Sequence, residues 1–177
     1  LLGAGLFARV LSAWGPTFTS NDVHRYLWDG HLFALGLDPW RLSPNQVEPG
    51  AWPLPPDNLN IPSLYPPGAM ALFAGAAHFG PVWGPWLWRT LVVLASSVTL
   101  VVVERLLREG PTARWLPLVA LNPLLVLEGG IGGHLDLVVA LSVVLALSAW
   151  RAQRLALLGV WVGVGALTRY SSSAPFG

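Results

Sequence analysis

The chain of 177 residues holds 10 basic and 9 acidic side chains, and its net charge is +1. Charged residues make up 11% of the chain, against about 25% in typical soluble domains. The balanced charge excludes a basic surface for nucleic acid, and the lack of cysteine excludes disulfides and thiolate metal sites. A soluble protein with unusually apolar helices is the alternative to a membrane protein.

Apolar segments, taken in chain order, predict an all-α fold, a multi-pass transmembrane helical bundle. Residues 1–14 predict part of a first helix, and a short apolar helix follows at 68–79. Further spanning helices are expected at 85–107, 115–128, 136–150 and 155–169. The uncharged run of 14 residues from Thr90 to Val103 is too long for a buried strand.

The two ends of the sequence are unusual for a complete membrane protein. The chain starts at Leu1 with no charged n-region before the first apolar stretch, so we do not expect a signal peptide. It ends in a polar tail that follows an apolar segment and includes Ser171–Ser173. We therefore expect 1–177 to be a single membrane domain, the N-terminal portion of a longer protein.

Loop charges predict the orientation of the helices. Arginine is in excess in the linkers 104–114 and 151–154, which is typical of the cytoplasmic side. Acidic residues dominate the long loop 15–67 and the turn 128–136, which are therefore expected outside the cytoplasm.

Aromatic residues near the start of the long segment 85–107 fit this orientation. Trp83, Trp86 and Trp88 are expected at the outer interface, where indole rings favour the boundary. We expect Arg89 to extend its side chain toward the same interface.

The loop 15–67 and the start of the segment 85–107 are both expected on the outer side, so the short helix at 68–79 must begin and end there. At about 1.5 Å per residue it reaches roughly 18 Å, less than the apolar core of about 30 Å. We expect a re-entrant or interfacial helix. The turn that holds Glu128, His134 and Asp136 is expected near the headgroups, surrounded by protein or water.

The outer loop 15–67 begins with a predicted amphipathic helix that starts at Asp22 and runs toward Gly36, capped by Ser20 or Asn21. One face of this helix carries side chains at i, i+3, i+4 and i+7. These are Asp22, Arg25, Tyr26 and Asp29. They either form a group of reactive side chains at the membrane surface, or Asp22 caps the helix while Arg25 pairs with Asp29.

Proline-rich stretches fill the rest of the outer loop. Proline fixes φ and restricts the residue before it, so we expect an ordered, irregular lid. Most of its residues fit a rigid surface loop. Tyr65, just before the short apolar helix, is the residue that we expect near a ligand.

The glycine-rich stretch Gly129–Gly133 is not a nucleotide-binding fingerprint, because no strand precedes it. We expect a tight turn here. The sequence does not predict a metal site built from side chains, because its four histidines lack the H-E-x-x-H spacing. It does not predict a serine hydrolase, because the chain has no nucleophile elbow.

Several motifs occur together in a characteristic order. They are Asn21-Asp-Val-His-Arg-Tyr-Leu-Trp-Asp-Gly30, Gly36-Leu-Asp-Pro-Trp40, Leu64-Tyr-Pro-Pro67, and Leu121-Asn-Pro123 with Glu128 and Gly133-His-Leu-Asp136. From about Ser20 to Tyr170 the chain resembles the GT-C-type integral membrane glycosyltransferases, and most closely their bacterial mannosyltransferase-like branch. It departs from their pattern at His134-Leu-Asp136, where His-Asn-Asp is common, in the polar residues after Tyr170, and in its shorter length.

The resemblance implies an active site outside the cytoplasm and a polyprenyl-phosphate-linked sugar donor. By position, Asp22 is the carboxylate that acts as base on the acceptor hydroxyl. We expect the other site residues to bind substrate, without a metal ion or cofactor. They are Arg25, Tyr26, Asp29, Tyr65, His134 and Asp136.

The expected function is transfer of a hexosyl unit, such as mannose, to a glycan, lipid or protein acceptor at the cytoplasmic membrane. The alternative from another class is a polytopic lipid or solute transporter, or flippase, which would carry polar groups on broken helices at mid-membrane. Asn122-Pro123 is the one candidate break. A non-catalytic assembly subunit is a further alternative.

Overall fold

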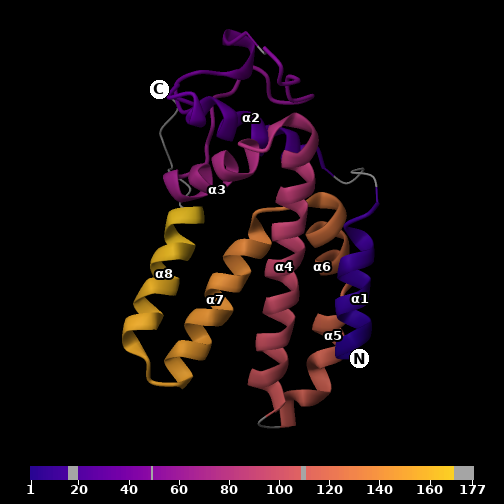
Figure 1. The fold of residues 1–177 in the computed structure, drawn as a ribbon. Coiled ribbons are helices and arrows are strands. Elements are labelled where there is room, and N and C mark those ends of the chain that lie inside the picture. The colour runs from indigo at the N-terminus through magenta and orange to yellow at the C-terminus, as the bar shows by residue number, and fades with distance from the viewer. Residues whose placement is uncertain (16–19, 49, 109–110, 170–177) are drawn as a thin grey trace. The chain divides into compact units, whose positions relative to one another are not determined.

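The computed structural model describes residues 1–15, 20–48, 50–108 and 111–169, and these residues form helices and loops with no strand among them (Figure 1). This confirms the all-α class for the described part of the chain. The polar tail 170–177 lies outside it. The chain divides into two compact units, Leu1–Ser20 with Arg89–Gly165 (unit 1) and Asn21–Trp88 with Ala166–Gly177 (unit 2).

Unit 2 is built on the contact between helices α2 (Asp22–Ala34) and α3 (Pro67–Ala77). The Tyr26 ring stacks on Phe73 with centroids 4.6 Å apart, and the Trp88 ring meets Phe73 edge-on at 5.1 Å. All three side chains are buried. Such aromatic packing supplies a large apolar area and fixes the rotation of α2.

A glycine allows this close approach. A Cβ at Gly30 would overlap the backbone of Phe73 and lie 2.5 Å from Ala74 N. Gly30 is the last residue of the motif that begins the resemblance, whose helical part Asp22–Gly30 is called the motif 22–30 below. It is therefore required by packing, because any larger side chain would push α2 away from α3.

The loop between α2 and α3 is tied down by hydrogen bonds and contains one 3₁₀ turn, Pro44–Gln46. Trp40 Nε1 donates to Tyr65 O at 2.6 Å, and Ser63 N donates to Pro39 O at 2.7 Å. These bonds join the two ends of the loop. Asn21 occupies the N-cap position of α2, but its side chain donates to Asp57 Oδ2 at 2.7 Å and makes no capping bond.

The long helix α4 runs from Gly80 to Arg108, 29 residues. It begins about one turn before the predicted start at Pro85. Because α4 begins at Gly80, Pro85 lies inside the helix. Pro81 lies in its first turn, where the missing backbone N–H costs little. Among the described residues, α4 is the one helix that is long and apolar enough by itself to cross a membrane.

Two expectations about the start of α4 are wrong. Trp88 is buried at 1% exposure in unit 2, whereas Trp83 and Trp86 are exposed as expected. Arg89 does not extend outward. It is buried, and it donates from Nε to Gly130 O at 3.1 Å and from Nη2 to Gly15 O at 2.6 Å. Buried backbone carbonyls need donors, and Arg89 supplies them.

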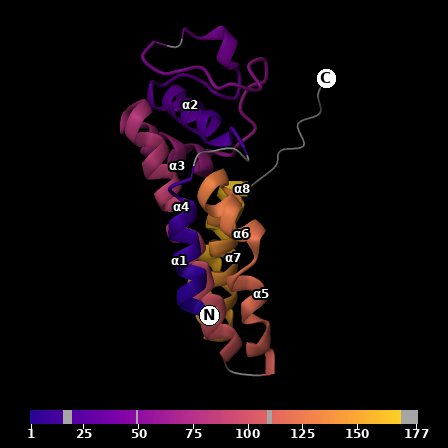
Figure 2. The ribbon, with the colours of Figure 1, turned by 90° about the vertical axis from the view of Figure 1, so that its right-hand side faces the viewer.

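In unit 1, helix α1 (Leu2–Ser12) packs against α5 (Leu116–Ala120) and α6 (Pro123–Leu127) (Figure 2). Its buried Arg9 donates from Nη1 to Ala120 O at 2.7 Å and from Nη2 to Val119 O at 3.2 Å, while its Nε donates to Ser96 Oγ at 3.0 Å. The guanidinium thus satisfies carbonyls at the end of α5 that have no partner within the helix.

The single helix predicted over 115–128 is wrong, because it is broken at Asn122-Pro123, the one candidate break in the sequence. A 3₁₀ turn (Pro111–Trp115) and α5 (Leu116–Ala120) precede the break, and α6 (Pro123–Leu127) follows it. Asn122 Oδ1 caps α6 by accepting from Leu124 N at 2.9 Å. The two halves are bent by 51°, and together they are long enough for one further broken span.

The glycine-rich stretch is not the tight turn that the sequence suggested. Residues Glu128–Gly132 continue α6 as one π-helical turn, and Gly133 ends it with φ at 61°. Helices α7 (Asp136–Arg151) and α8 (Leu155–Arg169) follow close to their predicted bounds and are joined by a short turn.

Candidate functional site

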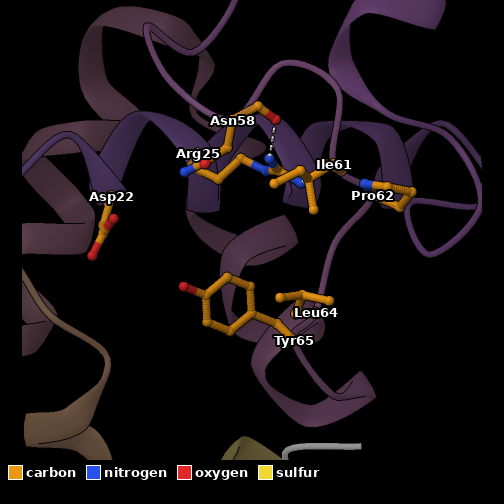
Figure 3. Close-up of a pocket in the computed structure, with 7 residues that line it drawn as sticks. All are labelled: Asp22, Arg25, Asn58, Ile61, Pro62, Leu64 and Tyr65. Atoms are coloured by element: carbon orange, nitrogen blue, oxygen red, sulfur yellow. Dashed lines mark hydrogen bonds between the residues drawn. The ribbon is translucent and has the colours of Figure 1, made fainter. Parts of the chain in front are cut away.

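Asp22 begins α2 and lines a cavity of about 160 Å³, the Asp22 cavity (Figure 3). The remaining walls come from α2 and from the end of the proline-rich loop. They are Arg25, Asn58, Ile61, Pro62, Leu64 and Tyr65. Asp22 is half-buried in the first turn of the helix, where the helix dipole favours an anion. The cavity therefore combines a carboxylate, a guanidinium and a phenol with apolar walls.

Arg25 is held from three directions. Its Nε donates to Asp29 Oδ1 at 2.9 Å, its Nη1 to Asn58 O at 2.9 Å and its Nη2 to Ile61 O at 2.6 Å. The Asp29 side chain that accepts from Nε is almost fully buried, with an exposure of 2%. Arg25 thus fixes the loop that forms the cavity wall, and Asp29 balances its charge.

The buried position of Asp29 governs its ionisation. Burial raises the pKa of this carboxyl, while the Arg25 guanidinium and a hydrogen bond from Ser63 act in the opposite direction. Asp29 is therefore not projected with Asp22 into a common group at the surface. Of the two alternatives for this helix face, the i,i+4 pair between Arg25 and Asp29 is the one observed, although Asn21 and not Asp22 holds the N-cap position.

Two tyrosines connect α2 with the loop. Tyr26 donates to Asp22 Oδ2 at 3.5 Å, and its ring meets the edge of the Tyr65 ring with centroids 5.1 Å apart. Burial, more than any other cause, raises the pKa of Tyr65. The Tyr65 phenol therefore keeps its proton at neutral pH and can donate a hydrogen bond inside the Asp22 cavity.

His134 and Asp136 lie in unit 1, where they line a second cavity of about 300 Å³ together with Glu128, the Glu128 cavity. His134 Nε2 lies 2.8 Å from Glu128 Oε2. The apolar walls are three leucines, Leu124, Leu125 and Leu137. Among the described residues, no group of three or more His, Asp or Glu side chains is placed to hold a metal ion.

A family model described as Alpha-(1->6)-mannopyranosyltransferase, N-terminal domain, matches residues 11–174. The chain belongs to this mannosyltransferase family. No curated protein and no solved structure matches it. Family membership agrees with the expected mannosyltransferase-like branch and supports a glycosyltransferase function.

The structure of this mannosyltransferase domain brings only some of the predicted site residues together. Asp22, Arg25 and Tyr65 share one cavity, Tyr26 and Asp29 lie buried next to it, and His134 and Asp136 belong to the other unit.

Sequence reasoning did not predict the partners of three ionisable residues, the buried Arg9 and Arg89 and the half-buried Glu128. Arg9 and Arg89 stand within apolar segments, and an ionisable residue in such a segment is a recognisable signal of a specific partner. Glu128 was visible only as part of a motif. Its pairing with His134 depends on the π-helical turn, which the sequence pattern did not predict.

Proposed function

We propose that the chain carries the catalytic base of a membrane mannosyltransferase that uses a polyprenyl-phosphate-linked donor outside the cytoplasm. The observation that carries the proposal is the different placement of the two carboxylates within the motif 22–30. Asp29 is buried and neutralised by Arg25, whereas Asp22 lines a cavity. Asp22 is thus the motif carboxylate that can reach a substrate.

Asp22 would take the proton of an acceptor hydroxyl as the acceptor oxygen forms a bond to the anomeric carbon of the donor. The bond from that carbon to the phosphate oxygen breaks in the same step, and the lipid phosphate leaves with the electron pair. The transition state has oxocarbenium character, as at other glycosidic centres. Tyr26, 3.5 Å from Asp22, supports the carboxylate position.

Arg25 would act mainly on the shape of the site. Each of its three nitrogens donates to a partner within the protein. Each Nη group has a second N–H, and Arg25 lines the cavity, so it can still contact the departing phosphate. Tyr65 would donate a hydrogen bond to the substrate.

The multi-pass topology is part of the proposal. It rests on α4, on the bent pair around Asn122 as a second span, and on the arginine excess in the linkers 104–114 and 151–154. Helices α1, α7 and α8 would complete the bundle as further spans, so that α7 returns the chain to the cytoplasmic linker 151–154, and α3 would be a re-entrant or interfacial helix. In this arrangement the lipid of the donor stays in the bilayer, and its sugar reaches the outer loop.

The transporter alternative draws on the broken helix at Asn122 and on buried Arg9. Both Nη atoms of Arg9, however, donate to carbonyls at the end of α5, so the arginine completes the break and does not line a path. Family membership also favours transfer over transport.

The experiment is a donor assay with the membrane-inserted full-length protein. Polyprenyl-phosphate mannose, polyprenyl-phosphate glucose and a nucleotide-linked mannose are each offered with a mannoside acceptor. We expect a new glycosidic bond only with the polyprenyl-phosphate mannose. Transfer from the nucleotide donor alone would contradict the proposed donor class, and translocation of the lipid-linked sugar without bond formation would favour the transporter.

A further inference from the structure

The Glu128 cavity is formed in part by an irregular helical turn. Its two facing polar groups flank an irregular stretch of backbone: Glu128 begins the π-helical turn Glu128–Gly132, and His134 follows Gly133, the residue that ends the turn. Such turns are rare and occur often at functional sites. Here the extra residue of the turn, followed by the left-handed Gly133, brings Nε2 of His134 to 2.8 Å from Glu128 Oε2.

The glycines of this stretch are required by the pairing. A Cβ at Gly132 would lie 2.5 Å from Glu128 Oε2 and 2.6 Å from His134 Cδ2, so a side chain there would separate the pair. At Gly129 a Cβ would lie 2.7 Å from Leu137 Cδ1, so the Leu137 side chain that lines the cavity would have to shift. The glycines thus permit the cavity and its polar pair.

The neighbouring helices support the irregular backbone. Arg89 donates to Gly130 O at 3.1 Å, and Ser12 Oγ donates to Val126 O at 2.9 Å. Gly130 lies so close to Ser12 that a Cβ there would overlap it. Residues of α1 and α4 therefore hold the π-helical turn in place, which keeps the Glu128–His134 pair preorganised.

The charges of the cavity decide the class of ligand. It carries two carboxyl groups, Glu128 and Asp136, and a single histidine. Two carboxylates repel a phosphate, so the phosphate of a lipid-linked donor is disfavoured here. Carboxylate and imidazole groups pair well with the hydroxyls of a neutral sugar. Leu124, Leu125 and Leu137 offer apolar contact to the C–H face of a pyranose ring.

We propose that the Glu128 cavity binds the hydroxyl groups of a mannosyl unit through the Glu128–His134 pair and Asp136. The proposal rests on the proposed function for the identity of the sugar. Both the acceptor and the sugar of the donor carry these hydroxyls, and they are distinguished by the measurements below. Glu128 and His134 would bind and orient the sugar and take no part in proton transfer.

Direct binding tests the cavity without requiring catalysis. Binding of a soluble α-1,6-linked mannobiose to the full-length protein in detergent is followed by saturation-transfer NMR. We expect Glu128→Gln and Gly132→Ala each to weaken binding at least about tenfold, the loss typical of a hydrogen bond to a charged group. His134→Gln, which keeps a donor near the position of Nε2, should retain more affinity than His134→Ala.

Matched variants control for the substitutions themselves. Glu48→Gln removes an exposed carboxylate in unit 2, and Gly159→Ala adds a methyl group at a helical glycine with nothing within 4 Å of its Cβ. Both should bind mannobiose like the parental protein. Inorganic phosphate at the same concentration should not displace the sugar. Unchanged binding in both Glu128→Gln and Gly132→Ala, or displacement by phosphate, would overturn the proposal.

Steady-state transfer then identifies the source of the mannosyl unit. A rise in KM for the acceptor in Glu128→Gln assigns the cavity to the acceptor, and a rise in KM for the donor assigns it to the donor sugar. An unchanged KM for both overturns the inference even if transfer itself is confirmed. Asp22→Asn should still bind mannobiose, so loss of transfer and loss of binding are separable failures.

Discussion

Arg25 and the buried Asp29 form an i,i+4 ion pair, with Nε and Oδ1 2.9 Å apart and side-chain exposures of 11% and 2%. The pair leaves Asp22 as the carboxylate of the motif 22–30 that borders a cavity. Arg25 also holds the carbonyls of Asn58 and Ile61, so one side chain links the helix to the loop that covers it.

Removing one partner of this pair should cost considerable stability. Arg25→Met leaves the Asp29 carboxyl buried without its cation, and breaking such a pair typically costs about 3–5 kcal/mol. We expect a clearly lower unfolding temperature for Arg25→Met in detergent. The double variant Arg25→Met/Asp29→Leu should recover part of the loss, because no charge is left buried. A double variant less stable than Arg25→Met would contradict a balanced pair.

Gly30 should tolerate no side chain. Gly30→Ala places a methyl group against the backbone of Phe73, which cannot rotate away. We expect α2 to separate from α3, with loss of the Asp22 cavity and of activity. Gly75→Ala on α3 is the matched control, because nothing lies within 4 Å of its Cβ. Unfolding temperatures that are equal for the two alanine variants would rule out this close contact.

His31 should make stability depend on pH. Burial, beside the Trp52 ring at a centroid distance of 5.1 Å, lowers the pKa of His31 below its usual 6.5. The folded state therefore prefers the neutral imidazole, and its contribution to stability is present above pH 6.5 and lost as pH falls through the lowered pKa. Unfolding temperatures measured from pH 7.5 downward should fall less steeply in His31→Gln. Parallel curves would show that His31 has no such role.

The spacing of apolar and motif residues predicted the short helices α2 and α3 and the bounds of α7 and α8 closely, and Asn122-Pro123 had been recognised as the one candidate for a helix break. These features depend on local chemistry, such as the proline at 123 and the change from polar to apolar sequence. The burial of Asp29, Trp88 and Arg89 was not predictable in this way. It depends on contacts between segments far apart in the sequence, such as Gly130 O with Arg89.

The backbone conformation of the π-helical turn Glu128–Gly132 also depends on contacts between segments far apart in the sequence, and it was not predicted either. The five residues Gly129–Gly133, four glycines and one isoleucine, fit a turn as well as a helix when the sequence is taken alone. The helix is stabilised by contacts from other elements, because Ser12 donates to Val126 O and Arg89 donates to Gly130 O. The pairing of Glu128 with His134 follows from that choice.

Topology is testable because the chain has no native cysteine. Single cysteines at exposed Ala51 in the outer loop and at exposed Ala152 between α7 and α8 should be labelled from opposite sides of the membrane. We expect a membrane-impermeant maleimide to label Ala51→Cys in intact cells, and to label Ala152→Cys only after permeabilisation. Labelling of both positions from the same side would contradict the proposed orientation.

The most direct measurement of the catalytic proposal is single-turnover mannosyl transfer by Asp22→Asn in the full-length, membrane-inserted protein. Loss of a general base typically costs about 10²–10⁴ in rate, so we expect at least about a hundredfold slower transfer with the unfolding temperature nearly unchanged. Asp57→Asn, which alters a carboxylate of the same loop that accepts from Asn21, serves as the control and should transfer at close to the parental rate. Parental single-turnover rates in a folded Asp22→Asn protein would contradict the assignment of Asp22 as the base.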